Sequence, residues 1–234
     1  MSSPETAPSR RPEDQRGTPV GRRIVLAMLG LGAVGVAVGS RVTNALSGVE
    51  AKDPTGLAQL LPTGGGFRYY SIAGPVKKVT PAEYTLSVTG LVERPVHLTY
   101  DQLAAMPQTH LVHDFQCVTG WRVPDVHWSG VLLRDVLALA SPTAEAVALR
   151  FTSFDHADTE SLTLEQAHRD DVIVALQMLG APVTHEHGGP VRLYVAPMYG
   201  YKSIKWLSGI ELTSSVIPGF WEDNGYPIDA YYSD

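Results

Sequence analysis

A single cysteine, Cys117, is the first residue in this sequence whose type and position could do chemistry. It follows an expected strand, 110–116, and Gly120 marks a turn soon after it, so we expect the thiol at a strand end. Arg122 supplies a nearby cation that would favour the thiolate. A thiolate is both a nucleophile and a soft metal ligand, so both chemistries remain open beside that of an inert, buried small residue. Large side chains in the expected loop that follows could wall a pocket: Trp121, Pro124 and Trp128.

Histidines and cations gather in a second segment, 185–206. His185-Glu-His187-Gly-Gly-Pro-Val-Arg192 is expected as a loop that leads into a strand. Lys202 and Lys205 follow Arg192 in a chain otherwise poor in charge. These cations and the backbone N–H groups of the glycine loop could bind an anion, although a solvated basic face has the same composition. The two histidines could ligate a metal, but no third ligand stands at a familiar zinc spacing.

The composition narrows the class of protein. The chain has 234 residues, of which 44% are hydrophobic, so it can bury the core of one large domain or two small ones. One cysteine excludes an intrachain disulfide framework and any thiolate-rich zinc or iron–sulfur site. A net charge of −6 gives no electrostatic footprint for nucleic acid, so we expect no nucleic-acid partner.

The N-terminal third changes character twice. Residues 1–21 are polar and rich in proline, which predicts a disordered leader. Residues 22–41 begin with Arg22-Arg23 and continue as a short, charge-free run rich in Gly and Ala, the pattern of a twin-arginine export signal or of an uncleaved signal-anchor. A buried helix is the structural alternative for this run. Residues 42–66 are expected to be a linker, and 67–234 one folded domain.

The folded part is expected to position these residues with short strands and short helices. Capping boxes at 99–102 and 163–166 each predict a short helix, and residues 131–140 have apolar positions at helical spacing. Strands outnumber helices without a regular βαβ alternation, so we expect an α+β, β-rich fold. The expected strands are 84–90, 110–116, 147–154, 172–176, 191–195 and 206–212.

Taken together, the two chemical segments resemble the sulfite oxidase fold of molybdopterin-dependent oxidoreductases. The strongest match runs from Leu176-Gln-Met-Leu-Gly-Ala-Pro to Gly-Gly-Pro-Val-Arg192 and on to Gly200-Tyr-Lys-Ser-Ile-Lys-Trp206. The second runs from Phe115-Gln-Cys117 to Trp128-Ser-Gly-Val-Leu-Leu133, and Leu91-Val-Glu-Arg-Pro also fits. The plan is closest to minimal, exported bacterial members that reduce substrates such as methionine sulfoxide. We expect no immunoglobulin-like dimerisation domain and no haem domain.

The resemblance implies a molybdenum–molybdopterin cofactor and a role for each matching residue. Cys117 would be the protein ligand to molybdenum, which the family binds with two dithiolene sulfurs of the pterin and one cysteine thiolate. Arg122 would orient a substrate oxygen, and Tyr199 and Tyr201 would line the pocket. Phe67-Arg-Tyr-Tyr70 replaces the family's early pterin motif and lacks its histidine. The expected cofactor contacts are Arg68, Tyr69, Ser153, His187, Arg192, Ser203, Ile204 and Lys205.

The function implied is oxygen-atom transfer by an exported enzyme. The substrate would be a small molecule: an S- or N-oxide that is reduced, or a sulfite-like compound that is oxidised. Electrons would be exchanged with an external quinone, cytochrome or membrane subunit, because the sequence has no haem or flavin motif. The protein would lie in the periplasm or cell envelope, and contact the membrane through residues 22–41 if these are uncleaved. Two alternatives are a metal-free binding or scaffold domain of the same fold, and a thiol hydrolase that uses Cys117 with His113 or a distant histidine.

Overall fold

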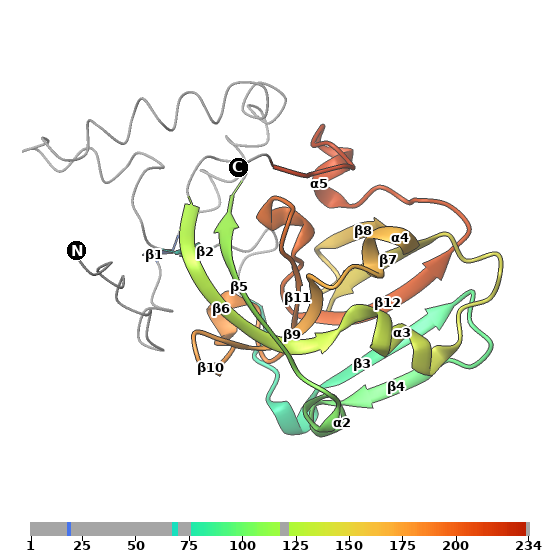
Figure 1. The fold of residues 1–234 in the computed structure, drawn as a ribbon, viewed down its shortest axis with the longest axis horizontal. Coiled ribbons are helices and arrows are strands. Elements are labelled where there is room, and N and C mark those ends of the chain that lie inside the picture. Colours follow the sequence, from blue (N-terminus) through green and yellow to red (C-terminus); the bar gives the residue numbers. More distant parts are fainter. Residues whose placement is uncertain (1–17, 20–66, 70–75, 118–121, 233–234) are drawn as a thin grey trace, which may run out of the picture.

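The computed structural model describes residues 18–19, 67–69, 76–117 and 122–232, with backbone alone at 18–19 and 68–69 (Figure 1). The predicted signal, 22–41, and the linker, 42–66, lie outside these residues. Of the predicted leader, only β1 (Thr18–Pro19) is described, and it pairs in parallel with β2 (Arg68–Tyr69). Within the described residues no helix is long and apolar enough to cross a membrane.

One five-stranded sheet is mixed and has one apolar face. On β3, Leu86 and Val88 are fully buried while Thr85 is exposed, the alternation expected of a strand with one buried face. β12 is the central strand, parallel to β3 and antiparallel to β7. In sheet order, the strands are β4 (Val96–Thr99), β3 (Thr85–Gly90), β12 (Leu207–Thr213), β7 (Ala148–Ser153) and β8 (Thr159–Thr163).

The other five-stranded sheet is antiparallel and holds the longest hairpin, β5–β6. β9 starts with five consecutive buried residues, Val172 to Leu176, because β6 and β11 flank it and both of its faces are covered. The strands are β5 (Thr109–Gln116), β6 (Arg122–Leu132), β9 (Val172–Met178), β10 (Ala181–Pro182) and β11 (Arg192–Val195).

The helices are short and lie in the connections. Both predicted capping boxes are confirmed: the Thr99 hydroxyl accepts from the Gln102 N–H at 3.2 Å, and the Thr163 hydroxyl from the Gln166 N–H at 3.1 Å. Among the described residues, the α-helices are α2 (Tyr100–Ala105), α3 (Leu133–Ala140), α4 (Leu164–Ala167) and α5 (Phe220–Asp223). The same residues include the single 3₁₀ turns η3 (Pro81–Glu83), η4 (His185–His187) and η5 (Gly200–Lys202).

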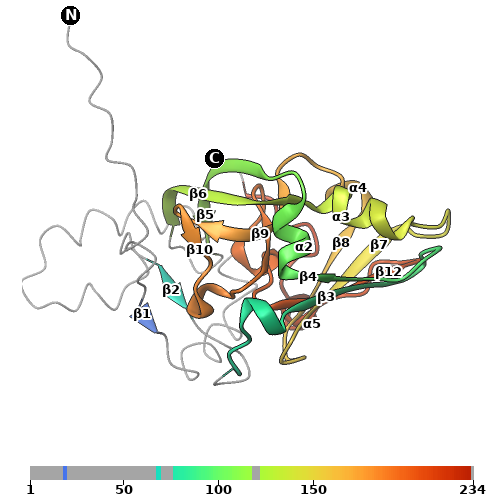
Figure 2. The ribbon, with the colours of Figure 1, turned by 90° about the horizontal axis from the view of Figure 1, so that it is seen from below.

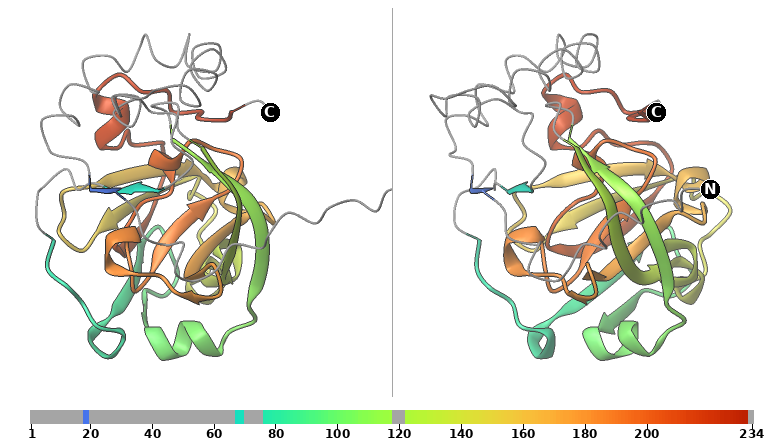
Figure 3. Two further views of the ribbon diagram at one scale, coloured as in Figure 1. Left: turned by 90° about the vertical axis from the view of Figure 1, so that its left-hand side faces the viewer. Right: turned by 60° about the vertical axis from the view of Figure 1, so that its left-hand side comes forward.

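Two apolar clusters join these elements. The larger one lies between the sheets and includes Leu86, Leu137 and Phe151. The smaller one surrounds Trp128 and includes Cys117 and Tyr194. Figure 2 shows the sheet that contains β6 and β9 above the sheet that contains β3, β4 and β12. Figure 3 shows the curved β5–β6 hairpin along one side of the molecule.

The α+β, β-rich class predicted from the sequence is confirmed, and β6 is the main correction. Pro124 and Trp128, expected in a loop, lie in this strand, and the helix predicted over 131–140 begins only at Leu133. Asp125 has a φ of 53°, and the register of the β5–β6 pair shifts between His113 and Phe115. This irregularity breaks the apolar alternation that identifies a strand in a sequence.

Candidate active site

Cys117 lies where β5 leaves its sheet, as the sequence predicted. Gln116, the last residue of β5, is paired with Arg122, the first residue of β6, so the hairpin tip separates Cys117 from Arg122. The Cys117 side chain is 5% exposed and belongs to the cluster around Trp128. Gly120 and Trp121 lie outside the described residues. A buried thiol at a strand end can face a bound group while the strand still fixes the position of its backbone.

Gly200 brings the second chemical segment to the first. A Cβ placed on Gly200 would lie 2.5 Å from Cζ of Phe115 and 3.3 Å from the carbonyl oxygen of Gln116. Only a glycine allows η5 to pack this closely on the end of β5. The segments that carry Cys117 and Lys205 are therefore neighbours, although they are far apart in the sequence.

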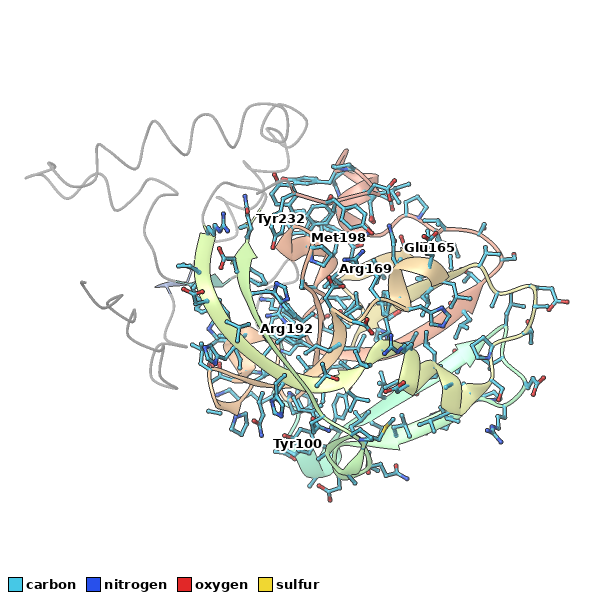
Figure 4. All side chains as sticks on the ribbon, viewed as in Figure 1. Tyr100, Glu165, Arg169, Arg192, Met198 and Tyr232 are labelled. Atoms are coloured by element: carbon cyan, nitrogen blue, oxygen red, sulfur yellow. The ribbon has the colours of Figure 1, made fainter. Side chains whose placement is uncertain are left out.

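Arg192 connects the two loops of the second segment (Figure 4). Its guanidinium donates Nη1–H to the carbonyl oxygen of His187 at 2.7 Å and Nη2–H to that of Ser203 at 2.6 Å. The guanidinium carbon also lies 5.5 Å from the Phe115 ring centroid and 5.4 Å from that of Trp128. Burial lowers the pKa of Arg192 to about 10, so the group still carries its charge at neutral pH. Arg192 thus fixes both loops and places a buried positive charge between them.

Lys205 is the second cation beside the two loops that Arg192 connects. Gly188, with a φ of 95°, lies directly beneath it, since a Cβ on Gly188 would be 2.5 Å from Cβ of Lys205. The ammonium nitrogen is 4.2 Å from the Trp206 ring centroid, and the Trp206 N–H donates to the Gly188 carbonyl oxygen at 2.9 Å. Burial and the charge of Arg192 lower the pKa of Lys205 to about 7. Two cations this close favour a bound anion.

Ser153 lies at the end of β7, in a turn that faces Lys205. Its hydroxyl donates to a carboxylate oxygen of Asp155 and accepts from the N–H of Asp158 at 3.1 Å. Burial raises the pKa of Asp158 to about 7, while Lys205 acts in the opposite direction. The described hydrogen bonds of Ser153 therefore hold the turn that brings two carboxyl groups to Lys205.

The remaining predicted cofactor contacts border the same two loops. The buried ring of His187 packs edge-on against Phe67, with centroids 4.7 Å apart. The Ser203 hydroxyl accepts from the Val195 N–H at 2.9 Å, and the Ile204 carbonyl oxygen accepts from the Leu193 N–H at 3.0 Å. The side chains of Arg68 and Tyr69 lie outside the described part of the structure.

Arg122 and the two predicted pocket tyrosines have partners away from these loops. Arg122, with its side chain 47% exposed, forms an ion pair with Asp114 of β5. The Tyr199 ring lies 5.6 Å from that of Tyr232 in the C-terminal segment, whose course Figure 4 shows near Met198. The Tyr201 hydroxyl donates to the Pro227 carbonyl oxygen at 2.6 Å. The C-terminal segment thus covers the tyrosines that the sequence placed in the pocket.

Tyr226 is a further candidate residue that the sequence motifs do not indicate. Its side chain is buried, and its ring centroid is 5.4 Å from those of Tyr201 and Trp221. Burial, and then the charge of the Cys117 thiolate, raises the pKa of its hydroxyl, so the two side chains are close enough to interact electrostatically. No local motif links residues so far apart, and only the folded chain brings them together.

The donor set fits the group that the resemblance implies. A cofactor with its own sulfur ligands needs one thiolate from the protein, and Cys117 supplies a buried thiol. Its anionic end needs cations and close backbone, which Arg192, Lys205 and the Gly188 turn provide. The fold and these residues together form a β-rich domain with a candidate site for an anionic cofactor that needs one protein thiolate.

Comparison with known families identifies the cofactor. The family model described as "Oxidoreductase molybdopterin binding domain" matches residues 73–221, and the chain belongs to this family. It is therefore a molybdopterin-dependent oxidoreductase of the sulfite oxidase fold, and its cofactor is molybdenum–molybdopterin.

Two relatives and one solved structure show how far the similarity extends. The chain is 37% identical to the uncharacterized oxidoreductase YuiH of Bacillus subtilis, over 62% of this chain and 72% of that protein. It is 28% identical to the protein-methionine-sulfoxide reductase catalytic subunit MsrP of Campylobacter jejuni, over 59% of this chain and 52% of that protein. The sulfane dehydrogenase SoxCD of Paracoccus pantotrophus shares the fold, with a TM-score of 0.57, 24% identity and coverage of 62% of this chain and 41% of that chain.

Proposed function

We propose that this chain is an exported molybdenum–molybdopterin enzyme that reduces the S-oxide of a small molecule or side chain. The observation that carries the proposal is the buried Cys117 thiol beside loops that Arg192 and Lys205 make positive. The MsrP relative supports the reductive direction and the sulfoxide substrate class. When bound, the cofactor supplies a metal that accepts or gives two electrons as an oxygen atom is transferred.

On the cofactor side, each residue holds or positions the bound group. Cys117 ligates the metal as a thiolate, and Lys205 binds the anionic end of the pterin. His187, Ser203 and Ile204 border the pterin from the two loops that Arg192 holds together. Ser153 positions the turn beside Lys205. Arg68 and Tyr69 are further proposed contacts, from β2 at the start of the domain.

On the substrate side, Arg122 and Tyr226 flank Cys117 from different elements. Arg122 is exposed beside the strand end, so it can attract and orient an anionic or strongly polar substrate oxygen. The Tyr226 hydroxyl keeps its proton at neutral pH, as an ordinary phenol does, and its raised pKa strengthens this, so it can donate a hydrogen bond to that oxygen. Tyr199 remains a proposed pocket residue from the neighbouring loop.

The whole-chain arrangement follows the same proposal. Residues 1–21 form the leader, 22–41 the twin-arginine-like signal or anchor, 42–66 the linker, and 67–234 the oxidoreductase domain. A protein exported by the twin-arginine route folds and receives its cofactor before it crosses the membrane. An external quinone, cytochrome or membrane subunit exchanges electrons with the domain in the periplasm or cell envelope.

Two opposed assays test this function on the full chain made in a host that supplies the cofactor. Methionine sulfoxide with a reduced viologen dye tests reduction, and sulfite with ferricyanide tests oxidation. We expect turnover in the first assay, and its loss in Cys117→Ser. Turnover only in the second assay would reverse the proposed direction. A protein that binds no molybdenum and turns over neither substrate would instead support a scaffold domain.

A further inference from the structure

Three buried ionisable side chains lie behind the candidate site, and the proposed mechanism does not use them. Lys202 of η5 and Glu160 of β8 have side chains that are 0% exposed, and the Glu222 side chain of α5 is 2% exposed. The Lys202 ammonium forms ion pairs with both carboxyl groups, at 2.6 Å for Glu160 Oε2. One ammonium in a buried place cannot neutralise two carboxylates, so the three groups need an added proton.

The hydrogen bonds distinguish the two acids. Both oxygens of Glu222 accept hydrogen bonds, Oε1 from Lys202 and Oε2 from the backbone N–H of Gly219. Glu160 accepts through Oε2 alone, from Lys202 and from the Ser161 N–H at 3.0 Å, and its buried Oε1 has no hydrogen-bond partner. Glu222 is therefore placed as the charged partner of Lys202, and Glu160 as the carboxyl group that keeps a proton.

The same pair joins the two segments that border Cys117. Lys202 directly precedes Ser203, and Glu222 precedes the turn that carries Tyr226, in which the Tyr226 N–H donates to the Trp221 carbonyl oxygen at 3.2 Å. A Cβ on Gly219 would lie 2.3 Å from the Thr159 carbonyl oxygen, so α5 begins in close contact with β8. A shift of Glu222 would move this turn.

We propose that the buried Lys202–Glu222 ion pair positions Tyr226 beside Cys117, and that Glu160 completes the pair as a neutral carboxylic acid. Lys202 and Glu222 are positioning residues, because they act through Tyr226. What Tyr226 does for turnover rests on the proposed function, whereas the charge assignment does not.

The electrostatic surroundings of Glu160 agree with this assignment. Burial raises the pKa of Glu160 well above its usual range; Lys202 lowers it and Glu222 raises it. Tyr201 of η5 faces the same carboxyl groups, and Asp158 before β8 faces Glu222. The folded chain therefore keeps a proton on Glu160 that the unfolded chain releases in the normal carboxyl range. Wild-type stability should fall as the pH rises above that range.

The test compares Glu160→Gln with Glu222→Gln in the full-length holoenzyme, with Glu211→Gln on the exposed face of β12 as control. Glu160→Gln keeps the neutral form, so we expect a melting temperature at or above the wild-type value at neutral pH, with a gap that widens as the pH rises. Glu222→Gln loses one of two acceptors, so we expect a lower melting temperature. Its kcat per bound molybdenum should fall about tenfold with KM little changed, because the turn that carries Tyr226 is displaced.

Equal stability losses in Glu160→Gln and Glu222→Gln would overturn the charge assignment. An unchanged kcat per molybdenum in Glu222→Gln would overturn the positioning role. If Glu222→Gln does not fold, a triple variant without charges, Glu160→Gln, Lys202→Met and Glu222→Gln, keeps the packing of these side chains. It should show the same loss of kcat. A wild-type kcat in this triple variant would also overturn the positioning role. A wild type without molybdenum would disprove the proposed function alone, since the melting curves still report the charge assignment.

Discussion

At the scale of single residues, the candidate site depends on two cations that lie close together: the buried Arg192 and the half-buried Lys205, with the carboxyl groups of Asp155 and Asp158 near Lys205. Arg192 donates its described hydrogen bonds to backbone carbonyl oxygens, and Lys205 lies close enough to it for its pKa to fall to about 7. Such a cation pair is unfavourable in an empty protein and becomes favourable when an anion binds. In the proposed function, the single thiol of Cys117 completes a site whose other metal ligands come with the cofactor.

Lys205 predicts how the stability of the cofactor-free protein, and its stabilisation by sulfate, change with pH. Between about pH 7 and 10.5, the ordinary pKa of a lysine, the unfolded chain keeps a proton on Lys205 that the folded chain has lost, so this group makes folding more favourable as the pH rises. A bound anion restores the proton. Asp158, neutral below about pH 7, strengthens anion binding in the same range. Sulfate should therefore raise the melting temperature more at about pH 6 than at about pH 8.5.

The control for this measurement is chloride at equal ionic strength, and the variant is Lys205→Met. The pH dependence of the sulfate effect should shrink in Lys205→Met, because Arg192 stays charged throughout the range and only Asp158 still titrates within it. A sulfate effect of equal size at both pH values in the wild type would show that Lys205 does not contact the anion.

At the scale of elements, the site is made by short turns packed closely on one another. η4 and η5 are each only three residues long, and the β5 end meets η5 at Gly200. Arg192 and Trp206 hold the η4 turn through its carbonyl oxygens, at 2.7 Å from His187 and 2.9 Å from His185. The glycines at these contacts, Gly188 and Gly200, therefore help to place Arg192 and Lys205.

Gly188 tests this packing, because Gly180 has a similar backbone conformation but different surroundings. Gly188 and Gly180 both have positive φ, at 95° and 77°, but a Cβ on Gly180 would meet nothing within 4 Å. Gly180→Ala should cost about 1–2 kcal/mol of the free energy of unfolding, from the backbone alone. Gly188→Ala should lose more and also release the pterin, because its Cβ displaces Lys205. Urea unfolding measures the loss in the free energy of unfolding, and pterin fluorescence measures the loss of bound pterin. Equal losses in both variants would contradict the packing argument.

At this scale, the sequence predicts well those elements whose pattern lies within a few residues. The strands at 84–90 and 172–176 and both capping boxes were found because each pattern lies within a few residues. β6 was missed because Asp125 and a register shift break its alternation. Tyr226, Glu160 and Glu222 were missed because only tertiary packing brings them to Cys117 and Lys202. Motifs single out Cys117 and Arg192, whose roles at the cofactor stay predictions, and only the folded chain shows the contacts of Arg192 with carbonyl oxygens.

At the scale of the whole molecule, one β-rich domain combines two sheets, and the site lies where segments from both meet. β5 and β11 of the antiparallel sheet carry or precede Cys117 and Arg192, and the ends of β7 and β12 adjoin Ser153 and Lys205. The family model covers residues 73–221, so the family assignment concerns this domain. The role of the N-terminal residues is a separate proposal that needs its own experiment.

Arg22-Arg23 carries the export proposal. Replacing both with Lys should leave the protein in the cytoplasm, because the twin-arginine route requires the arginine pair. Arg10-Arg11 is followed by Pro12 rather than by an apolar run, so the same replacement there is a matched control that should not affect export. Cell fractionation in a host with the twin-arginine machinery distinguishes the two. Normal export after loss of Arg22-Arg23 would contradict the proposal.

Cys117 is proposed to bind the molybdenum of a pterin cofactor, and molybdenum X-ray absorption spectroscopy reports on this bond. The full chain from a cofactor-competent host should bind about one molybdenum per chain. The metal's sulfur shell should contain one sulfur more than in Cys117→Ser, which should retain pterin through the Arg192 and Lys205 loops. An identical sulfur shell in both proteins, or a wild type without molybdenum despite a working cofactor supply, would contradict the claim.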